Sequence, residues 1–333
     1  MKKLLLHPPF EAARLERIKA SAGTMAVVNA ANPHEAAGEI ADATGFIGKI
    51  TPELLARATR LEWVQSPTAS LEHYIFPALV AHPCTLTNMR GLYSDVIADH
   101  VMGYVICFAR NLHLYVRQQV AGKWNPIGGE TDTLATGYGP GRVSGVDLAH
   151  QHLADCTMGI IGLGAIGAEI AVRARAFGLR VCAVDPIRTD DPPGVELTGL
   201  DGTDALLAAS DYVVIAAPHT PQTAGTFGLD SFRRMKPTAR LINIGRGAIV
   251  NLGALTEALR LGLIAGAALD VYETEPLPAG HPLWSTENVI LTPHIAGYSP
   301  RIAERHLEVL LDNVGRHSRS DPLRNVVRKA EWF

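Results

Sequence analysis

Cysteine is scarce in this chain, and no two cysteines are placed to act together. Cys84, Cys107, Cys156 and Cys182 lie far apart in apolar surroundings, and no Cys-x-x-Cys pair occurs. This spacing argues against a disulfide framework, a redox dithiol and a cysteine zinc site. The thirteen histidines show no zinc-ligand spacing such as His-Glu-x-x-His, so we expect no metal. The pattern is typical of buried, reduced thiols in a cytoplasmic protein.

The chain also lacks long apolar runs and an excess of charge of one sign. No segment approaches the ~20 apolar residues that a membrane-spanning helix needs. Lys2 and Lys3 precede Leu4–Leu6, but Pro8 ends this run well short of the roughly 7–15 residues of a signal-peptide core, so a short strand is the better interpretation. Thirty basic against thirty-three acidic residues give a net charge of −3. We therefore expect neither a membrane nor a nucleic acid as a partner.

The length of 333 residues suits about two domains. Residues 1–95 alternate short apolar runs with helical stretches, which predicts a small α/β unit. Its expected strands are Leu4–Leu6, Met25–Val28, Phe46–Ile47 and Leu61–Gln65, and its expected helices are Pro9–Ala20 and Pro52–Arg60. The apolar stretch Asp95–Leu114 predicts one long helix that joins the domains or packs against a second subunit. Trp124–Gly145, rich in Gly, Pro and Thr, predicts a long loop over the surface or around a neighbouring subunit.

Strict alternation of strands and helices begins at Cys156. Six short apolar strands are expected, at Thr157–Ile161, Arg180–Val184, Tyr212–Ala216, Arg240–Ile244, Gly266–Leu269 and Val289–Leu291. Helices are expected between them, at Ala165–Phe177, Ala205–Ala209, Leu229–Met235 and Leu252–Leu261. Short apolar strands linked by crossovers predict an α/β fold with a doubly wound parallel sheet. A last amphipathic helix, Pro300–His317, is expected to return to the first domain.

A glycine-rich turn, Gly162-Leu163-Gly164-Ala165-Ile166-Gly167, links the first of these strands to the helix after it. A lone Gly-x-Gly-x-x-Gly pattern has little specificity, but here a strand leads into it and a helix leaves it. Gly162 suits a tight turn, Gly164 lets the backbone approach a pyrophosphate, and Gly167 lets helix and strand pack closely. The free N–H groups at the helix N-terminus then face the phosphates. The turn therefore predicts a dinucleotide site.

An acidic residue follows the second strand, where a dinucleotide places its adenosine ribose. Asp185 stands eighteen residues after Gly167 and ends the strand Arg180–Val184. A carboxylate there binds the ribose hydroxyls and repels the 2′-phosphate of NADP, so NAD is favoured. Arg188, three residues further on, would soften that preference. The alternative is an ordinary helix-opening turn followed by a surface aspartate.

Ionisable residues come just after three later strands, at the edge where an open parallel sheet binds its ligands. They are Arg246, Asp270 and His294. Reduction of a keto acid by hydride needs an acid with a pKa near neutrality, an arginine that grips a carboxylate, and a carboxylate beside the acid. His294 and Arg246 suit the first two roles, and Glu273 and Glu275 compete for the third. The alternative is a solvated arginine and a structural histidine.

Four longer motifs match a known family in spacing as well as in residue type. They read LINIGRGAIVN (241–251), GAALDVYETEPLP (266–278), HPLW (281–284) and NVILTPHIAG (288–297). Together they resemble the D-isomer-specific 2-hydroxyacid dehydrogenase family over most of residues 85–300. The resemblance implies a doubly wound (Rossmann) NAD domain, residues 99–295, inserted in a smaller flavodoxin-like α/β substrate domain of residues 1–98 and 296–333. It also implies a homodimer.

The resemblance implies roles for individual residues. His294 is implied as the acid/base, Glu275 as the carboxylate paired with it, and Arg246 as the ligand of the substrate carboxylate and carbonyl. Arg90 and Gly91, before the linking helix, are implied to bind substrate together with Arg246 and His294. The implied NAD contacts are Gly162, Gly164, Ala165, Ile166, Gly167, Asp185, Pro186, Ala217, Pro218, Thr223, Ile244, Gly245, Asp270 and Gly297.

Two segments depart from the family pattern. The family often has a glycine-rich loop whose N–H groups hold the substrate carboxylate. This chain reads Ser66-Pro67-Thr68-Ala69-Ser70 there, with no glycine and with one N–H lost to proline. His73 beyond it is either a substrate contact or a surface residue. The segment 124–152 is longer than usual, and the sequence suggests no function for it.

The expected activity is NAD(H)-dependent interconversion of a small 2-keto acid and its (R)-2-hydroxy acid, with glyoxylate and hydroxypyruvate as favoured substrates. Formate or phosphite oxidation on the same scaffold is an alternative, but the formate enzymes place glutamine where Glu275 stands. A third hypothesis is an NAD-sensing protein similar to the C-terminal-binding-protein corepressors, which retain residues equivalent to Arg246, Glu275 and His294.

Overall fold

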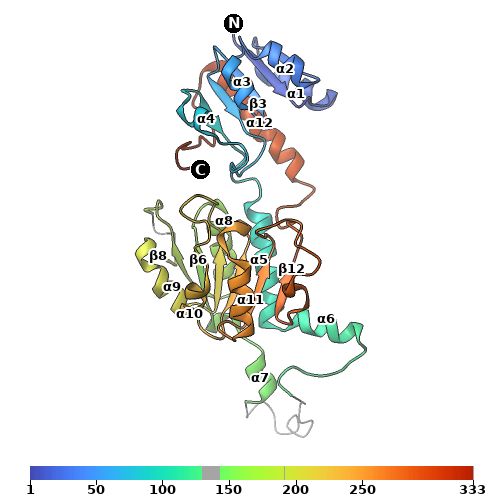
Figure 1. The fold of residues 1–333 in the computed structure, drawn as a ribbon, viewed down its shortest axis with the longest axis vertical. Helices are drawn as coiled ribbons and strands as arrows, with labels where there is room; N and C mark the ends of the chain where they lie inside the picture. The colour runs from blue at the N-terminus through green and yellow to red at the C-terminus, as the bar shows by residue number, and fades with distance from the viewer. Residues whose placement is uncertain (130–142, 191, 333) are drawn as a thin grey trace. The chain divides into compact units, whose positions relative to one another are not determined.

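The chain folds into two compact units, described here from a computed structural model of residues 1–129, 143–190 and 192–332 (Figure 1). One unit is Met1–Tyr93 together with Ser299–Phe333, and the other is Ser94–Tyr298. The second unit is therefore inserted into the first, and each has its own parallel sheet. The whole of helix α5 (Ser94–Ala109) belongs to the second unit. The boundary expected from the sequence, between residues 98 and 99, would have divided this helix.

The first unit has five parallel strands in the order β2-β1-β3-β4-β5, the order of flavodoxin-like folds. The strands are β1 Lys3–His7, β2 Ala26–Asn29, β3 Gly45–Gly48, β4 Trp63–Gln65 and β5 Thr85–Thr87. The helices are α1 Ala12–Ala22, α2 Pro33–Glu39, α3 Pro52–Arg57, α4 Pro77–Ala81 and α12 Ile302–Arg319. Three short elements were not predicted, namely β5, α2 and α4, because segments of three to seven residues carry little periodic signal.

The C-terminal helix α12 returns to the first unit, as predicted, and packs against α1 (Figure 1). Its apolar stripe buries Leu307, Leu310 and Val314. In the same unit, His317 of α12 lies against the ring of Trp63, with 5.1 Å between the ring centroids. Segments about 250 residues apart in the sequence therefore share one core.

The second unit has seven parallel strands in the order β12-β11-β10-β9-β6-β7-β8, which confirms the doubly wound sheet. The strands are β6 Thr157–Ile161, β7 Arg180–Val184, β8 Val195–Thr198, β9 Tyr212–Ile215, β10 Arg240–Asn243, β11 Gly266–Leu269 and β12 Val289–Leu291. Six of them were predicted, and β8 was missed because this edge strand is half exposed and has no continuous apolar run.

Helices cover both faces of this sheet. They are α5, α8 Ala165–Ala176, α9 Thr203–Ala209, α10 Leu229–Arg234 and α11 Leu252–Arg260. Alternate strand residues face the two sides, so that Val214 packs with α5 and α8 whereas Val213 packs with α9, α10 and α11. Both faces are therefore apolar, as continuous apolar strands predict.

The prediction of a single helix over Asp95–Leu114 is wrong, because the chain forms two helices there. Helix α5 ends at Ala109, and α6 begins at Leu112 and ends at Val120. Asn111 between them adopts a left-handed conformation with φ 54°, which asparagine tolerates better than most residues. Its side-chain amide donates to the carbonyl of Ala149 at 2.7 Å, and this bond stabilises the break.

The predicted loop Trp124–Gly145 lies partly outside the described residues, since 130–142 are among those not described. The segment directly after it forms a short helix, α7 (Gly145–Ala149), which Ser144 and Asp147 cap reciprocally. The long 124–152 segment is therefore not a loop throughout. Over the described residues, no helix is long and apolar enough to cross a membrane.

All four cysteines are free, and none has a reactive environment. Cys84 and Cys156 are buried, whereas Cys107 and Cys182 are half-buried. Burial raises the pKa of each thiol, which disfavours the nucleophilic thiolate.

Candidate active site

The strand order of the larger sheet reverses between β6 and β9, and the glycine turn lies at this switch point. Gly162 has φ +93° and lies against Ala217, whose backbone would be 2.8 Å from an added Cβ. A Cβ on Gly167 would lie 2.2 Å from the carbonyl oxygen of Gly162. Both positions therefore require glycine, one for its conformation and both for the close backbone approach.

The third glycine of the turn leaves room for a ligand. Gly164 is the N-cap of α8, where no side chain caps the helix, and a Cβ there would meet nothing within 4 Å. The N–H groups of Ala165 and Ile166 open the helix beside this space, where its dipole favours an anion. The residues present therefore fit the pyrophosphate of a dinucleotide.

Asp185 follows β7 and fixes the loop beside the turn. Its Oδ2 accepts from the N–H of Leu163 at 2.8 Å, and its Oδ1 accepts from the N–H groups of Ile187 and Arg188 at 2.9 Å. The carboxylate thus ties the dinucleotide turn to the loop after β7, in which Pro186 is exposed. These three bonds fix the negative charge of the Asp185 carboxylate at the position where the adenosine ribose is expected.

Arg188 approaches the same turn but is engaged by a neighbouring acid. Its Nη1 donates to the carbonyl of Leu163 at 3.0 Å. Its Nε and Nη2 donate to the two carboxylate oxygens of Asp190 at 3.0 and 2.8 Å. This two-bond geometry orients the guanidinium and partly neutralises its charge.

The other expected cofactor residues of this unit lie in loops at the carboxyl ends of β9, β10 and β12. Thr223 donates its hydroxyl to the carbonyl of Pro218 at 2.8 Å and so closes the loop after β9. Gly245 lies against the carbonyl of Ala217, 2.6 Å from where its Cβ would be, so the β9 and β10 loops pack together. The remaining expected contacts here are Ile244, which is buried, and Gly297, which is half-buried.

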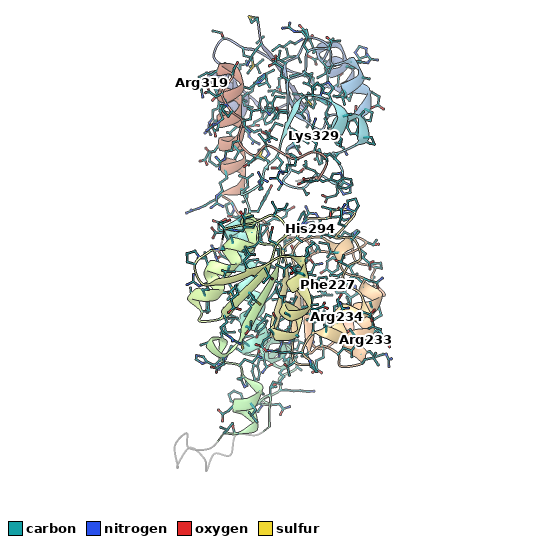
Figure 2. All side chains as sticks on the ribbon, turned by 90° about the vertical axis from the view of Figure 1, so that its left-hand side faces the viewer. Phe227, Arg233, Arg234, His294, Arg319 and Lys329 are labelled. Atoms are coloured by element: carbon teal, nitrogen blue, oxygen red, sulfur yellow. The ribbon has the colours of Figure 1, made fainter. Side chains whose placement is uncertain are left out.

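His294 and Glu275 meet at this edge of the sheet. The Nδ1 atom of His294 lies 2.7 Å from Oε2 of Glu275, and both side chains are partly exposed. The other carboxylate oxygen of Glu275 accepts from the N–H of Tyr272 at 3.0 Å, which holds the carboxylate in place. Figure 2 shows His294 at one end of the second unit. An imidazole with Nδ1 engaged in this way keeps Nε2 for a substrate.

The structure separates the two competing glutamates. Glu273 accepts from the N–H of Leu252 at 2.8 Å and so stabilises the N-terminus of α11, whereas Glu275 binds His294. The geometry therefore gives the two acids different partners.

Asp270, directly after β11, fixes the backbone on both sides of His294. Its carboxylate is only 2% exposed and accepts from the Thr292 hydroxyl at 2.6 Å and from the N–H groups of Ile295 and Ala296 at 2.9 Å. His294 itself has φ +54°, a left-handed conformation that costs a histidine on the order of 1–2 kcal/mol. The bonds to Asp270 hold this conformation, and the contact of Asp270 with the nicotinamide stays a prediction.

Arg246 stands in the loop after β10. Its Nη1 donates to the carbonyl of Gly245 at 2.6 Å, and its own carbonyl accepts from the side-chain amide of Asn243 at 3.1 Å. The next residue, Gly247, approaches so closely that a Cβ would lie 1.8 Å from the carbonyl oxygen of Tyr272. The Arg246 loop therefore packs directly against the loop that carries Glu275.

Arg90 and Gly91, the other expected substrate residues, lie in the first unit. Asn325 donates to the carbonyl of Arg90 at 2.8 Å, and the N–H of Arg90 donates to Oδ1 of Asn88 at 3.2 Å. Gly91 has φ +91°, which favours glycine there. The Arg90 side chain itself is exposed.

The loop Ser66–Ser70 is ordered without a glycine. Thr68 donates its hydroxyl to the carbonyl of Ser70 at 2.6 Å, and the side-chain amide of Asn88 donates to that of Ala69 at 2.7 Å. His306 of α12 lies 3.2 Å from the carbonyl of Pro67, and burial lowers the pKa of this histidine. His306 was not predicted as a neighbour of this loop, because it belongs to no local motif.

Comparison with known proteins decides the family. The model of the D-isomer specific 2-hydroxyacid dehydrogenase NAD binding domain matches residues 102–296. The chain belongs to this family. It is similar to the glyoxylate reductase of Korarchaeum cryptofilum, being 36% identical over 250 residues that cover 73% of this chain and 69% of that protein. It is therefore a dehydrogenase or reductase that acts on CH–OH groups, with a nicotinamide cofactor.

Solved structures support the fold of this dehydrogenase. A D-isomer specific 2-hydroxyacid dehydrogenase family protein from Aeromonas salmonicida is 30% identical, with a TM-score of 0.74 over 98% of each chain. An NADPH-dependent glyoxylate/hydroxypyruvate reductase from Sinorhizobium meliloti, in complex with NADP and sulfate, is 24% identical, with a TM-score of 0.78 over 100% of each chain. At that identity the second likeness shows the fold alone.

Proposed function

We propose that this dehydrogenase interconverts a small 2-keto acid and its (R)-2-hydroxy acid with NAD(H). The observation that carries the proposal is the pairing of His294 with Glu275 at 2.7 Å, at the carboxyl edge of a sheet whose glycine turn fits a dinucleotide. Glyoxylate and hydroxypyruvate are the preferred candidate substrates, because curated relatives are named glyoxylate or glyoxylate/hydroxypyruvate reductases.

The roles of the three site residues follow from their chemistry. When bound, the reduced nicotinamide supplies the hydride. His294 holds a proton at Nε2 and delivers it to the carbonyl oxygen, while Glu275 accepts from Nδ1 and holds the ring in place. Arg246 orients the substrate through its carboxylate and carbonyl oxygens. Arg90 and Gly91 remain candidates for substrate binding from the first unit.

NAD is the cofactor that we favour over NADP. Asp185 holds a fixed negative charge beside the dinucleotide turn, which would repel a 2′-phosphate. Arg188 donates to the carbonyl of Leu163 in that turn, but Asp190 engages its guanidinium with two bonds. The structural neighbour from Sinorhizobium meliloti was solved with NADP, and kinetics with NADH and NADPH test the preference.

A homodimer is the assembly that we propose, with α6 at the interface. Leu112, Val116 and Val120 follow each other at intervals of four, which places them on one face of the helix. Their exposed fractions are 42%, 58% and 86%, and no residue of α6 is buried. An unpartnered apolar stripe of this kind is suited to a second copy of the chain.

The activity is tested with a panel of 2-keto acids, with NADH and with NADPH, by following the loss of absorbance of the reduced cofactor. We expect turnover of glyoxylate and hydroxypyruvate with NADH. His294→Gln should abolish turnover while NADH still binds, and substantial residual turnover would exclude His294 as the acid/base. Reduction of NAD⁺ by formate or phosphite instead, seen as a rise in absorbance, would favour the alternative oxidation. No turnover with any compound, despite NADH binding, would favour a corepressor-like binding protein.

A further inference from the structure

Two polar side chains of α5 converge on one hydroxyl group next to the candidate acid. Tyr104 and His100 lie one helical turn apart, and their rings pack edge to face with 4.6 Å between the ring centroids. The Tyr104 hydroxyl is hydrogen-bonded to Oγ1 of Thr292, and Nε2 of His100 lies 3.2 Å from the same atom. Tyr104 is only 4% exposed, on a helix whose other buried residues are almost all apolar.

The direction of each hydrogen bond in this group follows from the carboxylate at its end. Asp270, as a carboxylate, only accepts, so the single hydroxyl proton of Thr292 is donated to it. Thr292 must then accept from its other neighbours through its two lone pairs. Tyr104 therefore donates its hydroxyl proton, and His100 donates from Nε2. Burial raises the pKa of Tyr104, which keeps its hydroxyl proton available for donation, and lowers that of His100, which favours the neutral imidazole.

Thr292 is also coupled directly to the backbone of His294. The N–H of His294 donates to the carbonyl of Thr292 at 3.1 Å, and His294 has the left-handed φ of +54°. Buried Tyr272 donates its hydroxyl to the same carbonyl at 2.9 Å. A strained backbone persists only where its surroundings determine it closely. A shift of Thr292 would therefore move the His294 ring away from Glu275.

We propose that Tyr104 and His100 are positioning residues for His294, acting through Thr292. The inference rests on the proposed role of His294 and extends it to a helix that contributes no group to the expected cofactor or substrate contacts. A displacement of the acid by about 1 Å is enough to cost up to roughly 100-fold in rate. The side chains on α5 would thus influence turnover without contacting substrate.

The test uses the whole chain with conservative changes. Thr292→Val and Tyr104→Phe each remove one hydroxyl at nearly constant volume, whereas Thr292→Ser keeps the hydroxyl. Tyr212→Phe is the matched control, because its buried hydroxyl donates to Oε1 of Gln151 at 2.6 Å, at the start of β9. We measure kcat, KM for the keto acid, the dissociation constant of NADH, and the ring ¹⁵N signals of His294 without cofactor, assigned with His294→Gln.

We expect Thr292→Val and Tyr104→Phe to lower kcat about tenfold, with NADH binding changed less than about twofold. The His294 ring signals should move in both variants. Thr292→Ser should restore kcat and the signals, and Tyr212→Phe should alter neither. The proposal is overturned if the two variants keep kcat and the His294 signals of the wild type, or if Tyr212→Phe loses as much kcat. A wild type inactive toward all 2-keto acids would refute the proposed function, whereas the ring signals would still test the positioning.

Discussion

Glu275 and His294 stand on loops that follow the neighbouring strands β11 and β12, and their side chains meet at 2.7 Å. Nineteen positions separate them in the sequence. Parallel strands place their carboxyl ends at one edge of the sheet, so this topology brings the acid and its carboxylate together. The pairing is the feature from which the chemistry of the site is most directly tested.

Replacing Glu275 with glutamine should lower the rate of keto-acid reduction by about tenfold or more, since the imidazolium loses its neighbouring charge. Steady-state kinetics with the keto acid and NADH measure this. Glu273→Gln is the control, because its carbonyl oxygen can still accept from Leu252. Equal losses in the two variants would contradict the specific role of Glu275.

Replacing Asp190 with asparagine should raise kcat/KM for NADPH by roughly threefold to tenfold, since Arg188 is freed to meet a 2′-phosphate. The value for NADH should change less than about twofold. Asp204→Asn, which removes the carboxylate that lies 3.0 Å from Arg234, controls for the loss of one surface charge. A wild type that prefers NADPH would show that the assignment to NAD is wrong.

Replacing Val116 with glutamate should convert the proposed dimer into a monomer, because a charge would be buried in the apolar face of α6. Light scattering coupled to gel filtration measures the mass directly. Gln118→Glu adds the same charge on the opposite face of α6, where the new carboxylate can still accept from the N–H of Asn125, and should leave the dimer intact. A wild-type protein that is monomeric at micromolar concentration would contradict the proposed dimer and its interface on α6.

Stability of the first unit should fall as the pH drops from about 6.5 to about 4. Burial, with a smaller contribution from Lys2, lowers the pKa of His317 from 6.5 to about 4. In this window the unfolded chain takes up a proton that the folded chain does not, so unfolding is favoured by up to about 3 kcal/mol at the acid end. Above pH 6.5 both states are neutral at this position and the contribution is fully present.

The pH effect is measured by calorimetric unfolding at pH 5.0 and pH 7.5. His317→Phe, which cannot titrate, should show a smaller fall in Tm between the two pH values than the wild type. His34→Gln changes an exposed histidine and should reproduce the wild-type fall. The same pH dependence in His317→Phe and in the wild type would show that another group is responsible.

Most of the fold of the larger unit could be predicted from the sequence, because its strands are short, apolar and separated by helices of ordinary length. The misses were of two kinds. The strands β5 (Thr-Leu-Thr) and β8 (Val-Glu-Leu-Thr) are short and have no continuous apolar run, unlike the equally short β12, which was predicted. The break at Asn111 depends on its bond to Ala149, thirty-eight positions away, which no local pattern reports.

By itself, the sequence determined the glycine turn, the alternation of strands and helices, and the ionisable residues at the strand ends. These features are local, since each depends on the conformation and polarity of neighbouring residues. Only the tertiary structure decided that Glu275 contacts His294 while Glu273 binds the N-terminus of α11. It alone joined Tyr104 to Thr292 across 188 positions, because hydrogen bonds between distant segments form only once the sheet has placed them together.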